Sequence, residues 1–126
     1  MTKIAIHTDA APVPTGPFNQ AIRHGNLVFT AGQAGRNRET GVMGDMADQA
    51  RRCIGNIAAI LEAAGTSLEH VLKVTVFMRD PKDRQAFNDV YVELMPKPFP
   101  ARTAAFCELG NPDMLVEMDV IAAMPE

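Results

Sequence analysis

The sequence is poor in the side chains that most often perform covalent or metal chemistry. Its 126 residues include no tryptophan, two cysteines, three histidines and a single serine, Ser67, which lies between a predicted helix and a predicted strand. A serine nucleophile at a sharp strand-to-helix turn is therefore not expected. The cysteines and histidines show neither Cys-x-x-Cys nor His-x-x-x-His spacing, and no glycine-rich loop precedes a helix. We expect no metal site and no phosphate-binding loop.

Long apolar runs and clusters of like charge are also missing. The net charge is −3, and the closest approach to a basic cluster is Arg36 with Arg38 and, further on, Arg51-Arg52. We interpret these as solvated charges and expect no nucleic-acid binding, which normally leaves a basic footprint. The start, Met1-Thr2-Lys3-Ile4, lacks the apolar segment of a signal peptide. We therefore expect a cytoplasmic protein without membrane contact, in which Cys53 and Cys107 are buried free thiols.

The length fits a single domain over residues 1–126. Apolar residues at helical spacing predict a helix from Met46 to Ala64, with Asp45 as its cap and Gly65 as the left-handed residue after its end. A second helix is expected from Asp80-Pro81 to the residue before Pro96. The order β-β-β-α-β-α-β-β indicates an α+β fold, with two helices on one face of a mostly antiparallel sheet. Strands are expected at residues 4–6, 18–23, 27–31, 71–79, 102–109 and 115–122.

The last two strands read as a hairpin around the turn Gly110-Asn111-Pro112-Asp113, with Leu109 opposite Met114. This register places Arg102 and Glu117 on the same face of the sheet, roughly 13 Å apart. The two side chains would then reach a ligand from opposite ends, or meet across a subunit boundary. The face that carries them is half apolar, and no further segment remains to cover it. We expect a homo-oligomer.

Arg102 and Glu117 are the best candidates for chemistry, although each has an ordinary structural interpretation. A guanidinium matches a carboxylate in bidentate fashion and stays charged when desolvated. Arg102 could equally pair with Asp119 or Glu117 to hold the hairpin. Glu117 could position a water as a general base, or balance the charge of Arg102. For Asn88, a solvent-facing position on the second helix is the favoured interpretation.

Several short segments follow one another along the chain: Gly16-Pro17-Phe18-Asn19-Gln20-Ala21, Thr30-Ala31-Gly32-Gln33, Asn88-Asp89-Val90-Tyr91, Pro100-Ala101-Arg102-Thr103 and Val116-Glu117. In this order they resemble the Rid family (reactive intermediate deaminases, also called the YjgF family). The resemblance covers nearly the whole chain and implies a chorismate-mutase-like α+β subunit, assembled as a homotrimer with clefts between subunits. It also implies cofactor-independent hydrolysis of 2-imino or enamine acids to 2-keto acids and ammonia.

The resemblance also implies roles for individual residues. Arg102 would hold the substrate carboxylate and Glu117 would orient the attacking water. Backbone groups near Gly32 and Ala104 would line the site, with Asn88 and Phe18 beside it. Many deaminating members have Tyr at the position of Phe18, Ser at that of Ala31 and Cys at that of Ala104. Because these polar groups are lost, the alternative is a non-catalytic carboxylate-binding or regulatory protein with the same fold.

Overall fold

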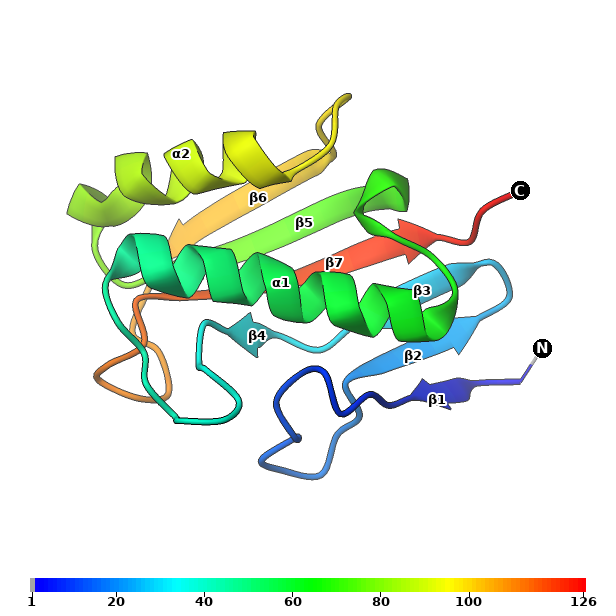
Figure 1. The fold of residues 1–126 in the computed structure, drawn as a ribbon. Coiled ribbons are helices and arrows are strands. Elements are labelled where there is room, and N and C mark those ends of the chain that lie inside the picture. The colour runs from blue at the N-terminus through cyan, green and yellow to red at the C-terminus, as the bar shows by residue number, and fades with distance from the viewer. Residues whose placement is uncertain (1) are drawn as a thin grey trace.

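The computed structural model describes residues 2–126 and shows one mixed sheet with two helices packed on one of its faces (Figure 1). The strands lie in the order β1-β2-β3-β7-β5-β6, and the short strand β4 also pairs with β7. Only β5 and β6 are parallel; the other neighbouring strands are antiparallel. The predicted α+β fold is confirmed. The strands are β1 (Ile4–Ile6), β2 (Ala21–His24), β3 (Leu27–Thr30), β4 (Gln33–Ala34), β5 (Val71–Met78), β6 (Ala101–Phe106) and β7 (Val116–Ala123).

Both helices begin where their capping side chains predict. Helix α1 (Met46–Ala64) starts with a capping box, in which the Asp45 side chain accepts from the Asp48 backbone and the Asp48 side chain accepts in return. It ends at Gly65, whose φ of 92° is in the left-handed region. The second helical segment opens with a 3-10 turn at Pro81–Asp83 and continues as α2 (Arg84–Leu94).

Alternating burial along β5 and β7 creates the hydrophobic core beneath the helices. Val74, Val76 and Met78 face the helices and are fully buried, as are Val116 and Met118, opposite them on β7. The register shifts between Val71 and Lys73, so that Val71 is buried while Leu72 is 51% exposed. Simple alternation along the strand predicted at residues 71–79 would place Leu72 in the core with Val74, and this bulge prevents it.

The predicted hairpin of the last two strands does not form, because β5 lies between β6 and β7. Helix α2 carries the chain from the end of β5 back to its start, so β6 can only run parallel to β5. The following segment, residues 107–115, is long enough to reach the far side of β5. Cys107 lies in this segment and is exposed, contrary to prediction, whereas Cys53 is buried as expected.

The true register separates Arg102 from Glu117 by the thickness of the sheet. Arg102 is paired with Val74, which faces the helices, whereas Glu117 is paired with Phe77 on the opposite, open face. Their predicted placement on one face is therefore wrong. Along β5 the two levels are three residues apart, roughly 10 Å, and β5 separates their strands by roughly another 10 Å.

Candidate functional site

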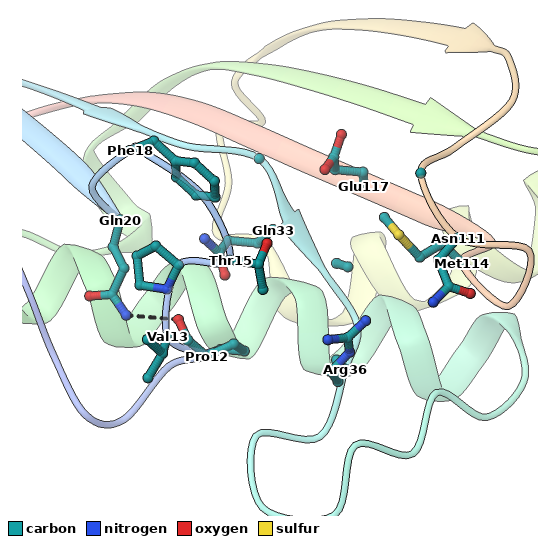
Figure 2. A pocket seen from close by; sticks show the side chains of 14 residues that line it. Pro12, Val13, Thr15, Phe18, Gln20, Gln33, Arg36, Asn111, Met114 and Glu117 are labelled. Carbon is teal, nitrogen blue, oxygen red and sulfur yellow. Dashed lines mark hydrogen bonds between the residues drawn. The ribbon is translucent and has the colours of Figure 1, made fainter.

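A cavity of about 490 Å³ lies on the open side of the sheet, at the level where β4 pairs with β7. Its walls come from segments far apart in the sequence, as Figure 2 shows. They are the proline-rich loop before β2, the end of β4 with the residues beyond it, the turn before β7, and Glu117. The lining residues are Pro12, Val13, Pro14, Thr15, Phe18, Gln20, Gly32, Gln33, Ala34, Arg36, Gly110, Asn111, Met114 and Glu117.

The proline-rich loop is held in place by Gln20, which is 1% exposed. Its amide oxygen accepts from the Thr8 backbone at 2.7 Å, and its amide nitrogen donates to the backbone oxygens of Thr8 and Pro12, both at 3.0 Å. Phe18, on the same loop, lines the cavity and stays 48% exposed. The ring of Phe18 therefore provides an apolar, accessible wall at a fixed position.

The opposite wall is anchored by three hydrogen bonds from two side chains, Arg79 and Gln49. The Nε of Arg79 donates to the backbone oxygen of Met114 at 2.9 Å. Gln49 on α1 is fully buried, donates to the backbone oxygen of Asp113 at 2.9 Å and accepts from the Leu115 backbone at 2.8 Å. These contacts tie the turn before β7 to helix α1 and to the end of β5.

Glu117 lies against the backbone of Gly32. A Cβ atom placed on Gly32 would be 2.9 Å from the Glu117 Cδ and 3.1 Å from its Oε1, so glycine at this position allows the carboxylate to lie where it does. Burial, and then the nearby charge of Asp119, raises the pKa of Glu117 above its ordinary value. The carboxylate is therefore more basic than one on the surface, and it faces a cavity that can hold a small molecule or a water.

Arg102 belongs to a second cluster, beneath helix α2. Its guanidinium carbon is 4.8 Å from the ring centroid of Tyr91 and 5.8 Å from that of Phe87, which is cation–π geometry. Arg102 forms no ion pair with any carboxylate of residues 2–126, so the predicted alternatives of pairing with Asp119 or Glu117 do not occur.

The same cluster contains two polar atoms without partners. The Oδ1 of Asn88 and the hydroxyl of Tyr91 are buried and lack a hydrogen bond within the described part of the chain. Burial raises the pKa of Tyr91, and the charge of Arg102 opposes this shift. Buried polar groups are normally satisfied, so these two atoms are open to a hydrogen-bond partner from outside the described residues.

The predicted site residues therefore fall into two groups. Phe18, Gly32 and Glu117 come together at the cavity, whereas Arg102 and Asn88 lie beneath α2. Two further predicted residues lie near these groups without lining the cavity. Ala31 precedes Gly32, and its backbone N–H donates to the backbone oxygen of Gln20. Ala104 follows Arg102 by two residues on β6 and is exposed.

The cavity also contains residues that sequence reasoning did not select, most notably Arg36. Arg36 is interpreted from sequence as a solvated charge, and no local signal in the sequence separates it from Arg38. Within residues 2–126, no three His, Cys, Asp or Glu side chains gather where they could hold a metal ion. In the same range, neither helix is long and apolar enough to cross a membrane.

Comparison with known proteins gives one consistent family. The family model described as Endoribonuclease L-PSP matches residues 8–124. A RutC family protein of Pyrococcus abyssi is 47% identical over 97% of this chain and 98% of its own. A protein of Dermatophagoides farinae named 2-iminobutanoate/2-iminopropanoate deaminase is 42% identical over 97% of each chain. The mitochondrial protein mmf2 of Schizosaccharomyces pombe is 39% identical over 98% of this chain and 99% of its own. The relatives thus include a mitochondrial protein.

Solved structures agree with this relationship. RidA from an Antarctic Psychrobacter superposes with a TM-score of 0.91 at 36% identity, covering 96% of this chain and 99% of that one. Escherichia coli TdcF with bound serine superposes with the same TM-score at 33% identity, covering 98% of this chain and all of that one. The chain therefore belongs to the Rid family, also described as the YjgF or Endoribonuclease L-PSP family.

Proposed function

We propose that the protein hydrolyses 2-imino acids, or the enamines in equilibrium with them, to 2-keto acids and ammonia. The observation that carries this proposal is the Glu117 carboxylate, partly desolvated and set against Gly32 at the wall of a small-molecule cavity. A relative of 42% identity is named as a deaminase of such acids, and the structure of TdcF holds serine, which carries a carboxylate and a nitrogen on one carbon.

The reaction mainly requires that a water molecule and the imine be held next to each other. A protonated imine carbon beside a carboxylate is already electrophilic, so a water that is held next to it can add directly. Glu117 accepts a proton from this water as its oxygen bonds to the imine carbon, and the proton then passes to the nitrogen. The tetrahedral adduct then collapses: its hydroxyl gives its proton back to Glu117 as the C=O bond forms, the C–N bond breaks and ammonia leaves. Each step moves only protons and the substrate's own electron pairs, so we propose that no cofactor takes part.

We further propose that two copies of the chain build each site. Arg102 lies on the helix face of the sheet and Glu117 on the open face, so one copy does not bring both to a small substrate. In the proposed assembly, a homotrimer, Arg102 of one copy binds the substrate carboxylate beside Glu117 of its neighbour. Two observations support it: the unpartnered Asn88 and Tyr91 atoms near Arg102, and the uncovered apolar side chains Phe29 and Ile121 on the open face.

A second candidate is a carboxylate-binding protein without catalysis. It is favoured by the apolar residues Phe18, Ala31 and Ala104, which leave only backbone polarity at positions where the family resemblance implies polar side chains. Phe18 reaches the cavity directly and has no hydroxyl to donate. This candidate predicts binding of 2-keto acids with no acceleration of imine hydrolysis.

A coupled assay separates the two candidates. An amino-acid oxidase generates the imine of alanine or 2-aminobutyrate, and the rate of keto-acid formation is followed with and without the protein. The deaminase proposal predicts acceleration that depends on Arg102 and Glu117. If the protein binds 2-oxobutanoate in calorimetry but leaves the rate unchanged, the binding-protein candidate is correct instead.

A further inference from the structure

Arg36 lines the same cavity as Glu117 and directly follows Gly35, which packs against α1. A Cβ on Gly35 would collide with the backbone of Gln49 on α1, so the side-chain direction of Gly35 is toward the helix layer. The Gly35 backbone oxygen is also held on that side by the Nε of Arg52 at 2.9 Å. Arg36 lies two residues beyond Ala34, which is paired with Glu117, and it lines the cavity together with Ala34 and Glu117.

Of Arg36, Arg38 and Arg52, only Arg36 has no hydrogen-bond or ion-pair partner in residues 2–126. Arg38 donates to the backbone oxygen of Asp9 at 3.1 Å and lies 3.6 Å from Glu39. Arg52 donates to two backbone oxygens, those of Gly35 and Met43. Arg36 makes no hydrogen bond and no ion pair within the described residues, and Glu117, the other charged group that lines the cavity, does not neutralise it.

An unpartnered guanidinium in a cavity wall is a site for an anion. Its planar fork matches a carboxylate, and its charge does not depend on pH in the physiological range. Thr15 and Asn111 line the same cavity, and they add a hydroxyl and an amide that can donate to a bound oxygen. Figure 2 shows Arg36 and Glu117 among the side chains that line the cavity, with Glu117 on β7 and Arg36 just beyond β4.

We propose that the preferred substrate carries a second acidic group: a 2-imino dicarboxylic acid whose side-chain carboxylate binds Arg36. This inference rests on the proposed function, in which Arg102 of a neighbouring copy binds the carboxylate next to the imine. The imine carbon then lies between the two arginines, beside Glu117. The cavity, at about 490 Å³, has room for the longer side chain.

The test compares two substrate classes in three proteins. Imines of aspartate and glutamate represent the dicarboxylic class, and imines of alanine and 2-aminobutyrate represent the monocarboxylic class, all generated by amino-acid oxidases. The proteins are the wild type, Arg36→Met, and Arg38→Met as the matched control, because Arg38 lies in the same segment but outside the cavity lining. The measured quantity is the ratio of kcat/KM for the dicarboxylic class to that for the monocarboxylic class.

Arg36→Met should lower this ratio about 10- to 100-fold, the usual effect of losing a hydrogen-bonded charge, and Arg38→Met should leave it unchanged. An unchanged ratio in Arg36→Met overturns the inference. If that variant loses both activities equally, Arg36 holds the carboxylate common to both classes, and the inference is again wrong.

Failure of the proposed function gives a different result, because the wild type would then accelerate neither class. In that case, calorimetry with 2-oxoglutarate and 2-oxobutanoate as probes tests whether Arg36 binds a second carboxylate. The inference predicts that Arg36→Met weakens binding of 2-oxoglutarate at least about tenfold relative to 2-oxobutanoate. Equal weakening of both probes, or of neither, overturns it without any appeal to catalysis.

Discussion

The substitution Gly32→Ala tests whether the position of the Glu117 carboxylate matters for the proposed reaction. The added Cβ would be 2.9 Å from the Glu117 Cδ, whereas ordinary contact begins at 3.4 Å, so the carboxyl group must move by about 0.5 Å, the difference between the two. The atoms to be displaced are the far end of a flexible side chain, and they can swing toward the cavity. We therefore expect the fold to be kept.

The expected loss of activity follows from this displacement. A misplacement of about 1 Å in a catalytic group costs roughly 100-fold in rate, so a shift of half that size should lower kcat/KM about tenfold. The free energy of unfolding should change by less than about 1 kcal/mol, as for a substitution that a flexible neighbour absorbs. The rate is measured by the oxidase-coupled assay and the stability by thermal unfolding.

Gly55→Ala is the matched control for this experiment. Gly55 lies in helix α1, is exposed, and meets no atom within 4 Å of an added Cβ. Alanine there should stabilise the helix by about 0.5–1 kcal/mol and leave the activity unchanged. Full activity of Gly32→Ala, at a Tm equal to that of the wild type, would refute the proposed role of Glu117.

Three further substitutions follow from the same geometry. Arg102→Ala should abolish the acceleration of 2-iminopropanoate hydrolysis while the oligomer, measured by sedimentation, stays intact; unchanged turnover would contradict the assignment. Burial raises the pKa of Glu117, so the folded protein disfavours its charged form. At pH values above that raised pKa, Glu117→Gln should therefore increase the Tm. This gain should shrink as the pH falls toward the ordinary pKa of 4.5. Melting curves at several pH values test this, and a gain that grows on acidification would be the wrong sign. Gly35→Ala should destabilise the protein by about 3 kcal/mol in denaturant titration, because the backbone of Gln49 cannot yield as a side chain can.

The helices could be predicted from sequence because their signals are local. Asp45 and Gly65 mark the ends of α1, and both cap as the pattern indicates. Strand pairing is not local. The turn at residues 110–113 resembles a hairpin connection. However, the crossover through α2 places β6 on one edge of β5, and β7 pairs with the other edge. The burial of Val71 in place of Leu72 depends on a bulge, which no alternation of residue types reveals.

The candidate site could be predicted from the sequence only in part. Glu117 and Gly32 were selected from the sequence and meet at the cavity wall, but their contact depends on β4, a two-residue strand too short to leave a pattern. Arg36 resembles Arg38 in every local respect. Only the structure distinguishes them, because it gives Arg38 a backbone oxygen to bind and leaves Arg36 without a partner in the described residues.

Arg102 and Glu117 are proposed to act together only across two copies of the chain, and a mixing experiment tests this arrangement most directly. Arg102→Ala and Glu117→Gln are each expected to be inactive. If they are unfolded together and refolded as mixed oligomers, about a quarter of the sites should combine an intact Arg102 from one copy with an intact Glu117 from its neighbour. Imine hydrolysis should then return to about a quarter of the wild-type rate. Mixed oligomers, verified by mass, that remain inactive would contradict the claim.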